Sequence, residues 1–141
     1  MKIAIRAATT GSGVYTTIAD GTVGNLVDFQ PPTMTKEPYV VNGYGADNKR
    51  VIDMGNAVWH AGAQIRKWYA SELLARQAIA TIGATLSGQI DVMITEDDDT
   101  GATYLPNCSC VEFSPNSDGQ TGITIHYNLK FVGPNYTTTA P

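Results

Sequence analysis

Residues 123–131 read Ile-Thr-Ile-His-Tyr-Asn-Leu-Lys-Phe, and their side chains alternate strictly between apolar and polar. One face of this stretch is wholly apolar, and the other carries threonine, histidine, asparagine and lysine. A period of two is typical of a β-strand that buries one face against a core and exposes the other. The stretch therefore predicts a half-buried strand in a protein whose fold is mainly β.

The same alternation recurs along the rest of the chain. Between the apolar runs lie turn and breaker signals, such as Asp20-Gly21, which favours a tight turn. Pro31-Pro32 predicts the end of a strand, because neither proline can donate a hydrogen bond to a neighbouring strand. Gly55-Asn56 predicts a bend. We expect strands in residues 1–6, 14–18, 22–29, 51–54, 57–69, 89–96, 107–113 and 123–131.

One segment has the period of a helix. Ser71 is a favourable N-cap, and Glu72 in the first turn suits the helix dipole. Apolar residues then recur at spacings of three and four, and Ser87-Gly88 ends the pattern. The pattern predicts a helix over residues 71–86 that covers one face of the sheet with the apolar residues Leu74, Ala75, Ala78, Ile79, Ile82 and Leu86.

These elements predict a single α+β domain that is mainly β. We expect an antiparallel β-sandwich or small barrel over residues 1–132, with one flanking α-helix and a long hairpin loop. A chain of 141 residues is long enough to bury such a core. Residues 133–141, with threonines and prolines, predict an extended and weakly ordered tail.

The long loop at about residues 33–50 allows two interpretations. Asn42-Gly43 is a turn signal, and apolar and aromatic residues flank it, which suits a hairpin packed on the body. The same segment also suits an arm that becomes ordered against a partner, because long loops in compact domains are usually functional or disordered.

Charge and composition exclude some classes of protein. The net charge of −4 argues against a surface that binds nucleic acid, although it allows a channel through which nucleic acid passes. The first residues hold too few apolar side chains for a signal peptide, and no run approaches the ~20 needed to span a membrane. Cys108 and Cys110 would share a strand face, where we expect two free thiols.

Residues with catalytic or metal-binding chemistry form no recognisable constellation. The acidic run Glu96 to Asp99 lacks the ligand spacing of an EF-hand, so we expect a solvated turn, with weak Ca²⁺ binding as the alternative. His60 and His126 lie far apart in sequence, and no nucleophile elbow accompanies them. A small hydrolase that uses either histidine is a weaker hypothesis, and we expect no enzyme, cofactor or metal site.

Aromatic residues raise a second class of function. Ring faces of Trp59, Trp68, Tyr69 and Tyr104 could together stack on sugars, which would make the chain a carbohydrate-binding β-sandwich module. The other interpretation places these rings in the core or at a subunit interface.

The order of elements from Ala57 to Val132 resembles the tail-tube proteins of long-tailed phages and related secretion tubes. A long strand, a helix, a hairpin around Asp98 and two closing strands carry the resemblance, together with the ending YLPNCSCVEF…ITIHYNLKFVG. The resemblance implies a structural subunit of a virion tail, either of the tube, of a tail-completion ring or of a distal-tail ring. It also implies that the tail is assembled in the host cytoplasm. It implies that residues 33–50 form an arm that reaches a neighbouring subunit or ring.

A tail subunit of this kind would join copies of itself into a homo-oligomeric ring through strand edges and the arm. Its partners would be other tail proteins, with DNA only as passing cargo and with no membrane. As candidates for subunit contacts we name Tyr39, Val40, Val41, Tyr44, Trp59, Trp68, Thr124 and His126.

Overall fold

The computed structural model describes residues 1–8, 13–20, 24–42, 49–96, 101–118 and 123–141; at 37–42, 49–56 and 118 it describes the backbone alone. Its elements are β1 (Lys2–Ala7), β2 (Thr16–Ala19), β3 (Asn25–Asn42), β4 (Lys49–Trp68), α1 (Glu72–Leu86), β5 (Gln89–Thr95), β6 (Ala102–Asp118) and β7 (Thr124–Gly133). The helix of this described part is neither long nor apolar enough to cross a membrane.

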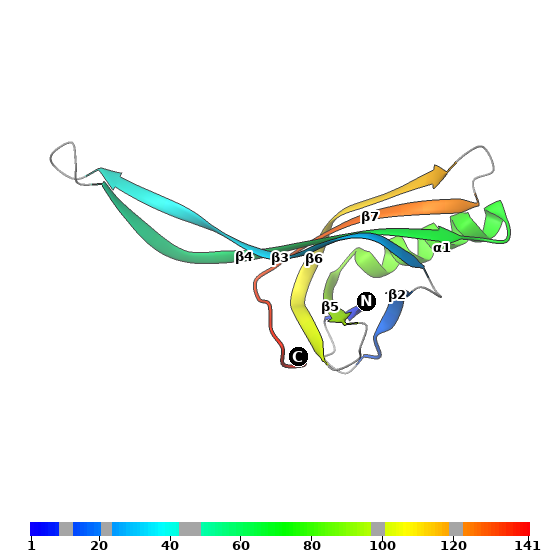
Figure 1. The fold of residues 1–141 in the computed structure, drawn as a ribbon, viewed down its shortest axis with the longest axis horizontal. Coiled ribbons are helices and arrows are strands. Elements are labelled where there is room, and N and C mark those ends of the chain that lie inside the picture. Colours follow the sequence, from blue (N-terminus) through cyan, green and yellow to red (C-terminus); the bar gives the residue numbers. More distant parts are fainter. Residues whose placement is uncertain (9–12, 21–23, 43–48, 97–100, 119–122) are drawn as a thin grey trace.

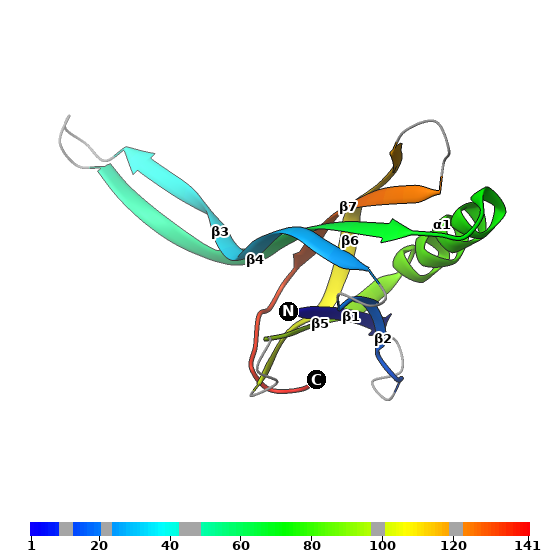
Figure 2. The ribbon, with the colours of Figure 1, turned by 45° about the vertical axis from the view of Figure 1, so that its right-hand side comes forward.

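The strands form one antiparallel sheet in the order β2-β1-β5-β6-β7-β4-β3. The sheet folds over on itself, so that β3, β4 and β7 lie in one layer and β1, β2 and β5 in the other, and β6 runs through both (Figures 1 and 2). The predicted fold class, mainly β with a sandwich or small barrel and one helix, is confirmed.

The change of layer occurs within β6. Its first half pairs with β5 up to Ser109, and from Ser109 onward it pairs with β7. Asn107 stands at this change with a positive φ of 52°, a backbone conformation that asparagine tolerates better than most residues. The Asn107 amide donates to the carboxylate of buried Asp91 at 3.0 Å, and Arg6 Nε donates to the same carboxylate at 3.0 Å. Asp91 therefore joins β1, β5 and the bend of β6.

Alternate residues of β7 fill the core, as the opening stretch predicts. Ile125, Tyr127, Leu129 and Phe131 are all 3% exposed or less. Between the layers they meet the inner residues of the other strands, and a hydrogen bond of 2.7 Å joins the hydroxyls of Tyr69 and Tyr127. The other buried apolar strand residues are Ile3, Ala4, Ile5, Ala19, Ala61, Ala63, Ile65, Ile90, Val92, Ile94, Leu105 and Cys108.

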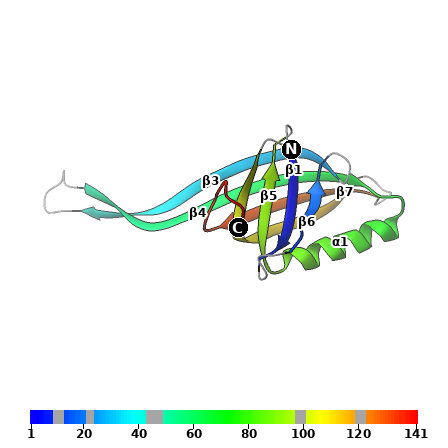
Figure 3. The ribbon, with the colours of Figure 1, turned by 90° about the horizontal axis from the view of Figure 1, so that it is seen from below.

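Helix α1 runs along one side of the folded sheet (Figure 3). The predicted N-cap is confirmed, because Ser71 Oγ accepts a hydrogen bond from the Leu74 amide at 3.2 Å. Ala75 and Leu86 are buried, and Ala78, Ile79 and Ile82 pack partly against the core. The prediction that Leu74 faces the sheet is wrong, since it is 48% exposed and Ala75 is the residue of that turn that reaches the core.

The prediction that Pro31-Pro32 ends a strand is wrong. Strand β3 continues to Asn42, with Gln30 opposite Gly62 and Thr33 opposite His60, so the two prolines face the single residue Ala61 in a bulge. Because β3 is the outermost strand of the sheet, a missing N–H on its outer side breaks no ladder bond. Position in the sheet, which the sequence alone does not give, explains the tolerance.

The tight turn predicted at Asp20-Gly21 lies partly outside the described residues. The strands on either side of it do not form a hairpin, since β2 pairs with β1 and β3 pairs with β4. They are the two edges of the sheet, and Asp20 N donates to Gly24 O at 3.2 Å where the edges approach each other.

The segment at 33–50 belongs to a long hairpin, which one of its two interpretations predicts, although that interpretation packs the hairpin on the body. Pairs between β3 and β4 continue from Thr33 with His60 to Asn42 with Lys49. Strand β7 stops at the pair of Gly133 with Trp59, so residues 37–42 and 49–56 pair only with each other and form what we call the arm ribbon. The ribbon extends far from the body (Figures 1 and 2).

The strands predicted at 51–54 and 57–69 are one continuous strand. At the bend predicted for Gly55-Asn56 the register shifts: Lys36 pairs with Ala57 and Pro38 with Asp53, so Glu37 alone faces residues 54–56. The turn predicted at Asn42-Gly43 falls mostly outside the described residues.

Candidate interaction surface

The outer face of β3, β4, β7 and β6 is polar. It carries the side chains that alternate with the core residues, and the register places them in rows across the four strands. Exposed or half-buried polar residues of these rows include Asp28, Gln30, His60, Gln64, Arg66, Glu112, Ser114, His126, Asn128 and Lys130.

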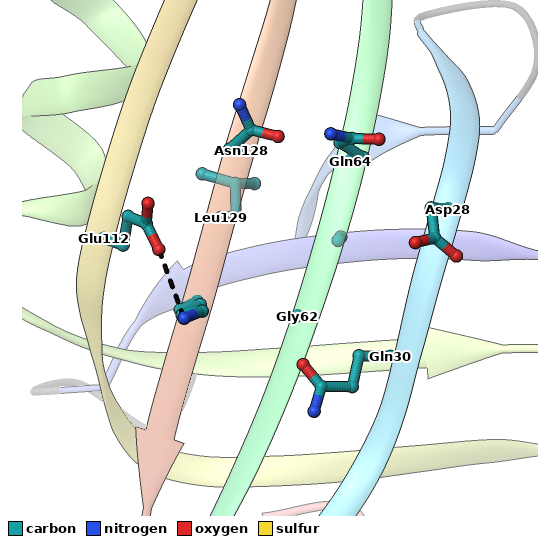
Figure 4. A pocket seen from close by; sticks show the side chains of 9 residues that line it. Asp28, Gln30, Gly62, Gln64, Glu112, Asn128 and Leu129 are labelled. Carbon is teal, nitrogen blue, oxygen red and sulfur yellow. Dashed lines mark ion pairs between the residues drawn. The ribbon is translucent and has the colours of Figure 1, made fainter.

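A hollow of about 300 Å³ lies in this face (Figure 4). Its cause is Gly62, which stands between Gln30 and Lys130 in one row and leaves the space of a side chain empty. Gln30 leans over the gap, since a Cβ on Gly62 would lie 3.2 Å from Gln30 Oε1. Asp28, Gln64 and Asn128 form the next row and complete the rim of the hollow.

The hollow can form hydrogen bonds but holds little net charge. Two carboxylates, from Asp28 and Glu112, and one ammonium, from Lys130, give a formal charge of −1. Lys130 Nζ and a Glu112 carboxylate oxygen lie 3.6 Å apart, and both side chains are solvent-exposed, so this pair contributes little stability. Within the described residues, no group of three histidine, cysteine or acidic side chains could hold a metal ion.

On each side, the same four-stranded layer has a strand edge with which no strand of the described residues pairs. Helix α1 lies beside the β6 edge, where a Cβ on Gly83 would be 3.3 Å from Phe113 Cε1. On one side β3 is the outermost strand along its whole length. On the other side residues 110–118 of β6 pair with β7, and β5 reaches only to Ser109, so in the described part of the chain no strand pairs with their outer side. Open edges offer unpaired N–H and C=O groups to another chain.

Each open edge displays a valine at a bulge. Val27 is the extra residue between the pairs of Leu26 and Asp28 with β4, and it is 55% exposed. Val111 is the extra residue between the pairs of Cys110 and Glu112 with β7, and it is 61% exposed. Sequence analysis missed both valines, although two consecutive apolar residues, Leu26-Val27 and Cys110-Val111, break the alternation and are a signal of a bulge.

Four of the predicted contact residues lie on or near the body. His126 and Thr124 lie on the outer polar face, half-buried, and Trp68 pairs with Thr124 and is 65% exposed. Trp59 packs on Tyr136 of the C-terminal tail, with 5.1 Å between ring centroids. Two further exposed apolar residues, Leu73 and Leu74, follow Trp68 in the first turn of α1; sequence analysis did not mention Leu73 and placed Leu74 against the sheet.

The other predicted contact residues belong to the hairpin. Tyr39, Val40 and Val41 lie in the β3 strand of the arm ribbon, where their backbones pair with Ile52, Val51 and Arg50. Tyr44 lies outside the described residues. The structure therefore separates the seven candidates that it describes into two groups, four on the body and three on the ribbon.

The residues with possible catalytic chemistry are not brought together. His60 Nε2 lies 2.9 Å from Thr35 Oγ1, and His126 stands opposite Arg66, six positions further along β4. Both cysteines are free, as predicted. Burial, with Asp91 adding to it, raises the pKa of the Cys108 thiol to about 12, and burial also raises the pKa of Cys110. Both thiols are therefore protonated, and poor nucleophiles, at neutral pH. Of the acidic run, Asp97, Asp98 and Asp99 lie outside the described residues.

The aromatic residues considered for sugar binding do not share one exposed face. Tyr69 is buried with its hydroxyl bonded to Tyr127, and Trp59 is covered on one side by Tyr136. Tyr104 packs near Tyr15, with 6.3 Å between ring centroids. Trp68 is the exposed member of the four.

Comparison with known proteins finds similarity in structure. No protein-family model matches the chain, and no curated protein is similar to it in sequence. A chain in the tail of an empty GTA particle with C6 symmetry is 17% identical, with 98% of this chain and 96% of that chain covered and a TM-score of 0.53. A chain in the virion of a native gene transfer agent (GTA) particle is 14% identical over 98% and 95%, with a TM-score of 0.51. At these identities the similarity shows a shared fold.

Proposed function

We propose that the chain is a structural subunit of a bacteriophage or phage-like tail, which joins copies of itself into rings or a tube through strand edges and the arm ribbon. Two kinds of observation support the proposal. The fold is shared with chains of a gene transfer agent particle, one of them in its tail. The open edges of the sheet supply surfaces for association.

The observation that carries the proposal is the pair of open edges on opposite sides of one four-stranded layer. The layer runs β3-β4-β7-β6, and each neighbouring pair is antiparallel. Because the number of strands is even, the two outer strands run in opposite directions. The β6 edge of one copy can therefore lie antiparallel to the β3 edge of the next and pair with it outside the bulge at Pro31-Pro32, where the prolines cannot donate. Such a head-to-tail contact generates a ring when the rotation closes.

The edges carry apolar side chains that suit this contact. Val27 and Val111 are more than half exposed in the single chain, and burial against a neighbouring copy would remove their apolar surface from water. The arm ribbon extends beyond the layer and would reach a further copy. That copy would supply a packing surface for the two ribbon strands, which pair only with each other in their own chain.

Ring closure would place the polar outer face of the layer along the wall of a central channel. The hollow on that face carries two carboxylates and one ammonium beside amide groups. A wall of this kind would be well hydrated and would not bind DNA phosphates tightly, because tight binding needs clustered Lys and Arg. DNA would then pass through the channel as cargo.

Light scattering over a concentration series, with negative-stain images of the same samples, tests the proposal. We expect rings or tubes of uniform diameter to appear as concentration rises. Val111→Lys and Val27→Lys should each prevent assembly while leaving the subunit folded, because a charged residue on an open edge opposes strand pairing.

Val14→Lys is the matched control. Val14 is 90% exposed but precedes β2 and lies on neither of the two open edges. The Val14→Lys variant should assemble as the wild-type protein does. A protein that stays monomeric at every concentration would contradict self-assembly, and rings that form normally in both edge variants would contradict pairing through these edges.

A further inference from the structure

We infer that the C-terminal tail, residues 134–141, is a brace that fixes the arm ribbon at its root. The arm root is the stretch where 33–36 pair with 57–60. The biological role of this brace rests on the proposed function, in which the arm ribbon contacts another subunit. The physical content of the inference is tested on the single subunit.

The brace touches β4 at the residue where pairing with β7 ends, next to the arm ribbon. Trp59 of β4 pairs with Gly133, the last residue of β7, and on its other side with Met34 of β3. Beyond this point the two strands pair only with each other. Tyr136 packs on Trp59 with the ring planes tilted by 43°, and both residues lie partly buried against the core. The contact therefore stands between the three-stranded region and the two-stranded ribbon.

The tail is held in place by main-chain bonds to β6. Tyr104 N donates to Thr137 O at 2.8 Å, and Thr137 N donates to Tyr104 O at 3.0 Å. These bonds occupy the side of β6 that faces away from β5, where β7 has already diverged. The tail thus runs from the arm root along the first half of β6, as Figures 1 and 2 both show.

A second anchor holds the far end of the tail. Arg6 donates to the main-chain oxygen of Pro141 at 3.0 Å and to Gly13 O at 3.2 Å. Its guanidinium lies 4.5 Å from the centre of the Tyr15 ring, and its Nε bonds Asp91. Arg6 therefore links the tail to the buried carboxylate that also holds the bend of β6. The tail connects this hydrogen-bonded part of the body with the arm root.

The direction of the tail depends on a close approach at Gly133. A Cβ on this residue would lie 2.8 Å from Cys108 Cβ, a distance that no real contact allows. Only glycine lets the end of β7 pass this closely over β6 before Pro134 starts the tail. This close passage brings Tyr136 to Trp59.

The tail contacts β1 and β6 of the body and also Trp59, the last residue of β4 that pairs with β7. A tilt of the ribbon that bends β4 at this residue would separate Tyr136 from Trp59, so the tail acts as a brace. Packing of an aromatic pair contributes on the order of 0.5–1.5 kcal/mol. Losing it should raise the equilibrium constant for local opening at the arm root, and with it the amide exchange rate there, by about two- to tenfold.

Hydrogen exchange of the dilute subunit tests the inference with Tyr136→Ala. We expect the amides of 33–36 and 57–59 to exchange about two- to tenfold faster, while those of 125–131 in the core keep their wild-type rates. Tyr136→Phe keeps the ring and should match the wild type. Thr138→Ala changes an exposed residue of the same tail and should also match it.

Unchanged exchange at the arm root in Tyr136→Ala would overturn the inference. So would an equal increase in Thr138→Ala, or an increase that includes 125–131, because each would separate the effect from the Trp59 contact. A subunit that shows the expected effect but never assembles would contradict the proposed function and leave the brace intact.

Discussion

Strand β4 passes through two regions of the molecule, and the difference between them decides what each region does. From Trp59 to Trp68 it lies between β3 and β7, and its inner residues Ala61, Ala63 and Ile65 are buried. From 49 to 56 it pairs with β3 alone. A two-stranded ribbon without a third layer is at best marginally stable in water. One strand thus runs from a layered body into a two-stranded ribbon, which on our proposal is stabilised by a neighbouring subunit.

The two regions should therefore differ in what they contribute to stability. Each fully buried aliphatic side chain of the body contributes roughly 1.5–3 kcal/mol from burial. A hydrogen bond of the ribbon contributes about 1 kcal/mol net, and ordering each residue costs a similar amount. We expect substitutions in the body to change the free energy of unfolding, and changes in the ribbon to affect mainly assembly.

The largest effect is expected from a charge in the core. Leu129→Asp places a carboxylate at a position that is 3% exposed, which should cost about 4 kcal/mol or more and unfold the body. Circular dichroism and urea unfolding measure this. Thr124→Asp, on the outer face of the same strand, should fold with a loss below about 1 kcal/mol, and equal unfolding by both would contradict the assignment of faces.

A smaller but still large effect is expected at the bend of β6. Asp91→Ala removes the carboxylate that accepts from Arg6 Nε and from the Asn107 backbone N–H. The largely buried guanidinium then loses its carboxylate partner, while it keeps the main-chain oxygens of Gly13 and Pro141 as acceptors. We expect a loss of about 3–5 kcal/mol in urea unfolding. Glu112→Ala is the control, because it removes the carboxylate of an exposed pair and should cost less than about 1 kcal/mol. Similar losses in the two variants would show that the buried pair has no special role.

Stability should also fall at alkaline pH, and this dependence belongs to the body. Burial raises the pKa of Cys108 from 9.0 to about 12, and burial together with the Tyr69 hydrogen bond raises the pKa of Tyr127 above its ordinary 10.0. The unfolded chain ionises first, so the stabilisation is complete below pH 9 and is lost as pH rises toward 12. Unfolding in urea at pH 7 to 11 measures it, and constant stability across this range would contradict the burial of these groups.

The smallest effect on stability is expected from removing the ribbon. In a variant that replaces residues 37–56 with Asn-Gly, the turn joins Lys36 to Ala57, which already pair with each other. The free energy of unfolding should change by less than about 1 kcal/mol, while light scattering should show that assembly is lost. A loss of several kcal/mol would mean that the ribbon is part of the cooperative body.

The sequence predicted those elements whose pattern is local. The alternation of 123–131 identified the buried face of β7, and Ser71 identified the start of α1, because a period and a cap depend on neighbouring residues. Pro31-Pro32 misled because its tolerance depends on the edge position of β3. The bend at Asn107 and the docked tail depend on contacts with Asp91 and Trp59, which are distant in sequence.

The interaction surface was predictable in part for the same reason. Alternation placed Thr124 and His126 on the polar face. The hollow depends on Gly62 standing beside Lys130, which only the register between β4 and β7 determines. Val27 and Val111 are candidate contact residues because they lie on strand edges, and the sequence alone does not show which strands are edges.

Hydrogen exchange of the wild-type protein at low and high concentration, with light scattering of the same samples, tests the central claim most directly. We predict that the core amides of 125–131 are protected at both concentrations. The amides of 37–42 and 49–56 should gain protection only in samples that contain assemblies. Equal protection of the ribbon in dilute, monomeric samples would contradict the claim that its order depends on a neighbouring subunit.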